Sequence, residues 1–235
     1  MCVLKYLFAL IAVGSMSNCT LAQVASPSSP SPPPARVALG FVGEINAPSM
    51  SNLLRIVNAQ VQAHVPAITI LLSSTGGDTS SAFAAYNLLR HLPIEVTMVN
   101  VGNVDSAAVV LFCAGKNRYS LPGPATRFLI HSNALTLAQA MPMDLFFLDN
   151  QLQQVKSLNQ MMVEALKSVT NKPSSEIERA VASQLILTPE QAKDWGLVQQ
   201  IRSDPLEPGT VLLSVNNSTT PEQKKSIEFS SVSVP

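Results

Sequence analysis

The chain has 235 residues, of which 46% are hydrophobic and only 13% are charged. Its 15 basic and 15 acidic side chains give a formal net charge of zero. This length and composition predict one main domain with a large apolar core, and the lack of a basic run argues against nucleic-acid binding.

The N-terminal segment has the pattern of a secretory signal peptide. A single lysine precedes an apolar run, which small and polar residues follow. The run is too short to span a membrane comfortably. Thr20 and Ala22 suit a cleavage site, so we expect a signal peptide over residues 1–22 and a periplasmic or secreted protein. Lipid attachment at Cys19 is an alternative that the preceding residues fit poorly, and a buried N-terminal helix is another.

Residues 23–35 are rich in proline and serine, which favours an extended spacer of polyproline type. We expect the folded domain over residues 36–203 and a polar C-terminal tail over residues 204–235. Removal of the signal peptide would leave Cys113 as the sole cysteine, so no intrachain disulfide is expected. Cys113 lies in an apolar stretch and is expected in the core.

Strand and helix patterns alternate through the first part of the domain. The apolar run Ile68–Leu72 is typical of a strand buried in a parallel sheet. The segment from Gly102 to Asp105 predicts a tight turn between a strand and a helix. The alternation favours an α/β domain with right-handed crossovers. The expected strands are residues 36–42, 68–72, 95–101, 119–121 and 127–130, and the expected helices are residues 50–65, 80–91 and 106–114.

A long helix is expected from Pro142 to about Val169, because apolar residues recur along it at helical spacing. It would be roughly 40 Å long at 1.5 Å per residue, too long to pack entirely on a domain of this size. Either it packs in the ordinary way within the core, or part of it packs on another subunit of a homo-oligomer. Further helices are expected over residues 174–183 and after Thr188, and an edge strand over residues 211–215.

Two segments carry candidate chemistry. An apolar strand ends at Gly76-Gly77 and opens a helix, and Ser106 stands at the start of another apolar helix. A Gly-Gly turn can present free backbone N–H groups, and a helix N-terminus favours negative charge. With His131 as a general base, these segments describe a site where a hydroxyl attacks a carbonyl and a neighbouring loop holds the oxyanion.

Four motifs occur in an order and at spacings similar to those of one family. They are Ser73-Ser74-Thr75-Gly76-Gly77-Asp78, Gly102–Ala108, Phe128–His131 and Leu187–Val198. Over about residues 37–201 the chain resembles the proteolytic subunit of the Clp protease, a serine peptidase of the ClpP/crotonase fold. The resemblance implies an α/β spiral of βαβ units with a long protruding "handle" helix, and rings that stack through that helix.

The resemblance places the nucleophile at Ser106, the base at His131 and the oxyanion hole at the N–H groups of Gly77 and Ala107. The family's aspartate falls on Gln184, which cannot carry the charge that stabilises an imidazolium but can accept a hydrogen bond from the base. Loss of that charge costs about four orders of magnitude in the serine-protease template. We therefore expect either a slow Ser-His-Gln peptidase or a dyad.

A carboxylate from elsewhere is a further possibility. Asp78 and Asp105 are the nearest in sequence, and each is otherwise a turn or cap residue. His64 and His91 lie near helix ends and are expected to be surface or capping residues. Because no residues have zinc-site spacing and no phosphate-loop motif occurs, neither a metal nor a cofactor is expected.

These features predict an exported, ATP-independent serine peptidase that cleaves peptides or unfolded proteins. The family's N-terminal loops, which dock an ATPase, are replaced here by the proline spacer, so no ATPase partner is expected. The glycine-rich strand that lines the family's substrate groove is missing after His131. The alternatives are a non-catalytic binding or assembly protein of the same fold, and a Ser-Lys peptidase, for which Lys116 is the lysine nearest to Ser106 in sequence.

Overall fold

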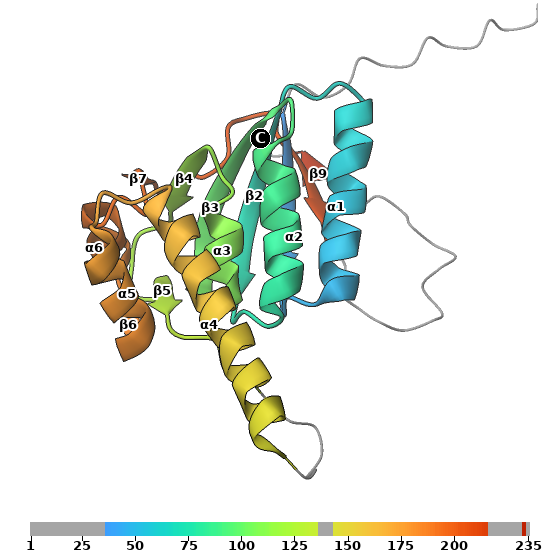
Figure 1. Cartoon of the computed structure of the whole chain (residues 1–235). Coiled ribbons are helices and arrows are strands. Elements are labelled where there is room, and N and C mark those ends of the chain that lie inside the picture. Colours follow the sequence, from blue (N-terminus) through green and yellow to red (C-terminus); the bar gives the residue numbers. More distant parts are fainter. Residues whose placement is uncertain (1–35, 136–142, 216–231, 234–235) are drawn as a thin grey trace, which may run out of the picture. The chain divides into compact units, whose positions relative to one another are not determined.

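The computed structural model describes residues 36–135, 143–215 and 232–233, which form a mostly parallel sheet packed against helices (Figure 1). The strand order is β6-β5-β3-β2-β1-β8-β9, and β4 joins β3 to β7 beside this row. The elements are β1 (Val37–Val42), α1 (Ala47–Gln62), β2 (Ala67–Ser74), α2 (Thr79–Arg90), β3 (Glu95–Asp105), α3 (Ala107–Phe112), β4 (Asn117–Ser120), β5 (Arg127–Ile130), α4 (Leu145–Lys167), α5 (Ser174–Ser183), β6 (Leu185–Leu187), α6 (Pro189–Asp194), β7 (Gln200–Ile201), β8 (Val211–Ser214) and β9 (Val232–Ser233).

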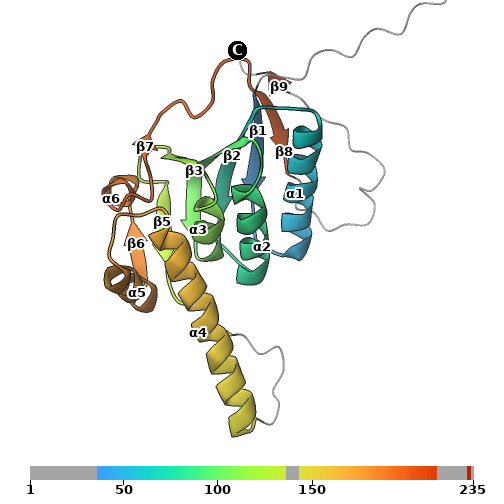
Figure 2. The same cartoon turned by 45° about the horizontal axis from the view of Figure 1, so that its top comes forward.

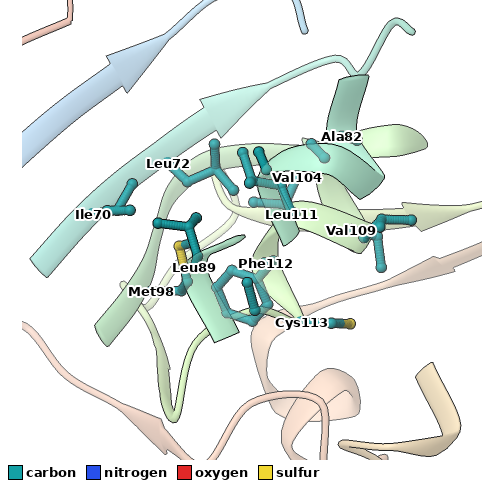
Figure 3. Close-up of a cluster of buried hydrophobic side chains, with 14 of the residues drawn as sticks. Ile70, Leu72, Ala82, Leu89, Met98, Val104, Val109, Leu111, Phe112 and Cys113 are labelled. Carbon is teal, nitrogen blue, oxygen red and sulfur yellow. The ribbon is translucent and has the colours of Figure 1, made fainter. Parts of the chain in front are cut away.

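The core lies between one face of the sheet and the helices. In the parallel ladder Ile70 stands between Leu39 and Met98, and all three side chains are fully buried. Figure 3 shows this packing, with side chains of β2 and β3 facing those of α2 and α3, and with Cys113 just beyond the end of α3. Burial raises the pKa of the Cys113 thiol to about 12, and its place in the core is confirmed.

The expected parallel strand over 68–72 is confirmed, but its burial is one-sided. Ile68, Ile70 and Leu72 are buried, whereas the alternate residues of β2 are half-buried. Successive side chains of a strand point to opposite faces of the sheet, so the helices cover the face of Ile70 more completely than the other.

The tight turn expected from Gly102 to Asp105 is wrong, because β3 continues through this segment. The register between β2 and β3 shifts after Leu72, with the extra residues in β3, so that Ser74 stands opposite Val104, and the end of β3 then pairs with β5. Gly102 allows β2 and β3 to approach each other closely, because a Cβ atom at this position would lie 2.5 Å from the Ser73 hydroxyl oxygen. The strand therefore delivers Ser106 directly to the start of α3.

Helix starts are set by side chains that cap free backbone N–H groups. Asn46 and Ser49 form a capping box, so α1 begins at Ala47, three residues before the expected start. Thr188 and Gln191 form a second capping box at α6, as the Thr188 cap predicts.

The long helix is confirmed over 145–167, and its expected start at Pro142 lies outside the described residues. Its C-terminal turns are buried, including Val163 and Leu166, whereas Leu145 and Phe146 are 85% and 77% exposed. Figures 1 and 2 show its N-terminal half projecting beyond the sheet. Among the helices described, none is both long and apolar enough to cross a membrane.

The C-terminal strands extend the sheet past residue 203. The strand expected over 211–215 is present as β8, parallel to β1, but β9 pairs with its outer side, so β8 is not the edge. The three-residue β6 was not expected, and it pairs antiparallel with β5. The predicted signal peptide, spacer and Cys19 alternative fall outside the described residues.

Candidate active site

Ser106 joins β3 to α3 in a strained backbone conformation. Its φ of 59° and ψ of −125° lie in a region that residues with a Cβ atom rarely adopt, at a cost of about 1–3 kcal/mol. The Ser106 N–H donates to the Leu129 carbonyl at 2.8 Å, and its own carbonyl accepts from Val109 at 2.9 Å. A serine on such a strand-to-helix turn presents its hydroxyl at the end of the sheet.

The Ser106 hydroxyl does not cap the helix that begins after it. A serine at a helix N-cap ordinarily accepts a hydrogen bond from the first turn, but Ser106 makes no capping bond. Within the described residues, its hydroxyl forms no other hydrogen bond. The strain therefore holds a free hydroxyl in place.

The Gly76-Gly77 loop packs directly against Ser106. A Cβ atom on Gly76 would lie 2.7 Å from Cβ of Ser106, and Gly76 also has a φ of +93°. A Cβ atom on Gly77 would lie 2.1 Å from the Ile45 carbonyl oxygen. Ile45 holds the loop, donating to the Gly76 carbonyl and accepting from the Asp78 N–H, both at 2.8 Å. Only glycine fits at both positions, as a loop that approaches a reacting centre requires.

Two backbone donors at this loop have no hydrogen-bond acceptor among the described residues. They are the N–H groups of Gly77, which is exposed, and of Ala107, the first residue of α3. The first N–H groups of a helix have no partner within it. A Cβ atom on Gly76 would lie close to Ser106 and to the Ala107 nitrogen, so the loop meets the start of α3 here, where the two N–H groups could bind a carbonyl oxygen under attack.

His131 follows the last residue of β5 and is half-buried. Its Nδ1 lies 2.7 Å from the Ser132 carbonyl oxygen, which can only accept, so Nδ1 carries the proton and Nε2 is left free as a base. Asp105 pairs with Leu129 in the ladder, so Ser106 and His131 leave the same end of neighbouring strands. Within the described residues, the two side chains form no hydrogen bond with each other.

A polar network holds the segment after His131. Both the backbone N–H and the Nδ2 of Asn133 donate to Oδ1 of Asn159 in α4, at 2.7 and 2.9 Å. The Thr79 hydroxyl at the start of α2 donates to Oδ1 of Asn133. Helices α2 and α4 are thereby tied to the segment that carries the candidate base, a link that sequence reasoning missed.

Gln184 stands at the same end of the sheet as His131. It is the exposed C-terminal cap of α5, with a left-handed φ of 59°. In the antiparallel ladder Leu185 faces Ile130, so Gln184 and His131 are the residues that follow this last pair outward on the two segments. Within the described part of the chain, the Gln184 side chain makes no hydrogen bond.

The two carboxylates nearest in sequence have different roles. Asp78 caps α2, because its side chain accepts hydrogen bonds from the N–H groups of Ser80 and Ser81, and its expected role as a cap is confirmed. The hydrogen bond that it accepts from the Ser81 hydroxyl lowers the pKa of the Asp78 carboxyl. Asp105 is neither a turn nor a cap residue. It ends β3 with a buried side chain and pairs with Arg127, Nη2 to Oδ2, at 2.8 Å. This hydrogen bond raises the pKa of Arg127.

Lys116 lies far from Ser106. Its side chain is 76% exposed, and its ammonium lies 3.8 Å from the carboxylate of Glu95, the first residue of β3, whereas Ser106 follows the last residue of that strand. The strand between them spans about 30 Å. A cavity of about 570 Å³ at the Lys116 end of β3, lined also by Arg90 and Arg118, is therefore separate from the candidate site.

The other histidines have the surface positions expected of them. His64 is exposed just beyond α1, and the exposed His91 caps the C-terminus of α2. Among the described residues, no group of three or more metal-ligating side chains could hold an ion.

The chain is similar to several Clp protease subunits. It is 31% identical to the ATP-dependent Clp protease proteolytic subunit 2 of Corynebacterium jeikeium over 134 residues, which are 57% of this chain and 63% of that protein. It is 34% identical to the corresponding subunit 2 of Borreliella burgdorferi over 137 residues, 57% of this chain and 66% of that protein. The match thus spans slightly less than two thirds of each relative.

A solved structure has the same fold. An asparagine-to-aspartate mutant of ClpP1 from Listeria monocytogenes aligns with a TM-score of 0.62 and 21% identity, over 72% of this chain and 92% of that one. This agrees with the α/β architecture and its mostly parallel sheet. A family model described as Clp protease matches residues 39–205. Because that match covers well over half of the sequence, the chain belongs to the Clp protease family.

Proposed function

We propose that this chain is a serine peptidase that cleaves peptides or unfolded proteins. Ser106 is the nucleophile, His131 the base, and the N–H groups of Gly77 and Ala107 bind the oxyanion. The observation that carries this proposal is the strained Ser106, which is an N-cap residue whose hydroxyl caps nothing while Gly76 packs against it. Strain of this kind persists only where the surrounding structure enforces it, and it concentrates at functional sites.

The proposed reaction follows from these positions. A substrate carbonyl oxygen binds the two N–H groups, and Oγ of Ser106 attacks the carbonyl carbon while Nε2 of His131 takes the hydroxyl proton. His131 then gives that proton to the leaving amine, the C–N bond breaks and an acyl-enzyme remains. Water attacks the ester with His131 again as the base, which releases the acid and restores Ser106.

In a catalytic triad the aspartate both orients the histidine and stabilises its positive charge, and the Ser132 carbonyl can do the first of these. It accepts the Nδ1 proton and so selects the tautomer with a free Nε2. A neutral carbonyl and a neutral Gln184 stabilise the imidazolium less than a carboxylate does. We therefore propose an enzyme with a correctly oriented base and slow turnover.

The test is labelling by a fluorophosphonate probe, which reacts with activated serines. We expect labelling of the purified protein and its loss in both Ser106→Ala and His131→Ala. His91→Ala is the matched control, because His91 is exposed at a helix end, and it should label normally. A folded protein that does not label, or a Ser106→Ala variant that still does, would contradict the proposal and favour the non-catalytic alternative.

The non-catalytic alternative is a binding or assembly protein of the same fold. The missing charge at Gln184 and the lack of a hydrogen bond between Ser106 and His131 within the described residues support it. Hydrolysis of unstructured peptides that disappears in Ser106→Ala would exclude it. The Ser-Lys alternative is disfavoured, because Lys116 stands at the opposite end of β3.

The proposal extends to location and assembly. We propose export through residues 1–22 and action without an ATPase, both of which the sequence pattern supports. We also propose a homo-oligomer formed through α4, which the exposed apolar residues of that helix support. The export step is tested by N-terminal sequencing of the protein from a periplasmic or medium fraction. A mature N-terminus near residue 23 is expected, and an intact Met1 in the cell interior would contradict export.

A further inference from the structure

The residue before Ser106 is a buried carboxylate with an incomplete set of partners. The Asp105 side chain is only 4% exposed, and its Oδ2 binds Arg127. Its Oδ1 is buried with no hydrogen-bond partner within the described residues. Buried charged oxygens ordinarily have hydrogen-bond partners. If the Asp105–Arg127 ion pair served only to link β3 and β5, the lack of a partner for Oδ1 would be unexplained.

The register of the sheet sets Asp105 midway between Arg127 and His131. Asp105 pairs with Leu129, and Arg127 stands two residues before Leu129 on the same strand. The contact between Arg127 and Asp105 shows that a side chain at this diagonal position reaches the carboxylate. His131 stands two residues after Leu129, at the matching diagonal, where strand spacing and rise give a Cα separation of about 8 Å.

We propose that Asp105 supplies the negative charge that Gln184 lacks. In this arrangement Oδ2 stays on Arg127, and Oδ1 faces the imidazolium that forms when His131 takes the Ser106 proton. Asp105 is thus a positioning residue that acts through His131. Its effect on catalysis rests on the proposed peptidase function, whereas its effect on the charge of His131 does not.

Other charges near this end of the sheet do not explain the arrangement. The Asp78 carboxylate is engaged at the start of α2, and the Glu44 side chain lies beside Gly77. Gln184 on the β6 side, and Asn133 with Asn159 on the α4 side, are neutral. Because these groups are unchanged in Asp105→Asn and in Arg127→Gln, their contributions cancel when the two variants are compared.

The test separates a charge effect from a structural cross-link by its sign. Asp105→Asn and Arg127→Gln both break the ion pair, so a structural role predicts similar consequences for the two variants. The proposal predicts opposite ones: loss of Asp105 lowers the pKa of His131, and loss of Arg127 raises it. At this separation we expect shifts of about 0.5 to 1 pH unit, the Arg127 effect being smaller because its side chain is 45% exposed.

The measurement is an NMR titration of the histidine ring signals of the purified protein. The chain has only 3 histidines, so His131→Ala identifies the signal of the base, and His64 and His91 serve as internal controls that should not shift. Shifts of the same sign in both variants, or below about 0.2 unit in Asp105→Asn, would overturn the proposal. The readout needs no hydrolysis, so an inactive protein leaves the test intact.

A rescue variant covers the case in which Arg127→Gln does not fold. Adding Gln184→Asp to Asp105→Asn places a carboxylate on the other side of His131. We expect the pKa of His131 to return to or above its original value, together with kcat if the protein is a peptidase. If Asp105→Asn leaves the pKa of His131 unchanged, there is no effect for the second substitution to restore, and the role of Asp105 is refuted.

Discussion

At the scale of single residues, the geometry around Ser106 depends on a glycine. A Cβ atom on Gly76 would meet Ser106 and the Asp105 carbonyl at 2.7 Å, whereas one on Gly209, also at positive φ, would meet nothing within 4 Å. Both positions therefore carry the conformational cost of a left-handed residue, but only Gly76 carries a steric one as well.

Gly76→Ala should destabilise the protein more than its matched control Gly209→Ala. We expect about 1–2 kcal/mol for the control and about 3 kcal/mol or more for Gly76→Ala, with loss of probe labelling in any folded fraction. Urea denaturation of both variants measures the difference. Equal midpoints would show that the loop does not press on Ser106.

A second residue-scale prediction concerns the charge beside the base. Gln184→Asp should raise kcat by about 10- to 100-fold with little change in KM, because a carboxylate facing His131 stabilises the imidazolium. Aspartate tolerates the left-handed conformation of this position. Peptide hydrolysis is the assay. Gln184→Asn is the control, because asparagine has the same side-chain length as aspartate but no charge. An equal gain in the asparagine variant would point to side-chain size instead.

At the scale of elements, helix α4 and the segment after β5 are coupled through Asn159. Its Oδ1 is the acceptor for both donors of Asn133, two residues beyond His131. Asn159→Ala should cost about 1–3 kcal/mol and lower kcat, because it leaves the Asn133 donors unpaired and the base less fixed. Denaturation and peptide hydrolysis measure the two effects.

Asn150→Ala is the matched control, because it makes the same change on an exposed turn of the same helix. It should leave stability and turnover near the wild-type values. If Asn159→Ala resembles the control in both measurements, the network does not position His131.

At the scale of the whole molecule, the projecting half of α4 leaves apolar side chains exposed. Leu148 and Leu152 are 48% and 50% exposed, next to the more exposed Leu145 and Phe146. Soluble proteins rarely leave such a contiguous apolar face open, and a second copy that covers it would account for these residues.

Leu152→Asp should shift the protein to a smaller species in sedimentation experiments, because a buried unpaired charge weakens an apolar interface by several kcal/mol. Leu88→Asp is the control, since Leu88 is 55% exposed on α2. It should leave the mass unchanged. A wild-type protein that sediments as a monomer would rule out assembly through α4.

Much of the fold could be predicted from the sequence, because it depends on local patterns. The apolar periodicity of α1, α2 and α5, the runs of β1 and β2, and the cap at Thr188 all involve residues close together in the chain. The glycine pair and Ser106 could be selected as candidates for the same reason, because each directly follows an apolar strand in the sequence. The expected turn after residue 101 was wrong, because the pairing with β2 and β5 that continues β3 involves residues distant in the chain, and Gly102 allows close packing instead.

Only the tertiary structure showed the long-range contacts around His131 that no local pattern predicts. Three-residue β6 is too short to show a periodicity, yet its pairing with β5 brings Gln184 and His131 to the same end of the sheet. The Asp105–Arg127 pair joins residues 22 apart, and the Asn133–Asn159 pair joins residues 26 apart, so neither leaves a local signature. The sequence by itself determined the chemical groups available and the elements that carry them, because these depend on short-range propensity. Their partners depended on strand register and helix packing, which exist only once the chain has folded.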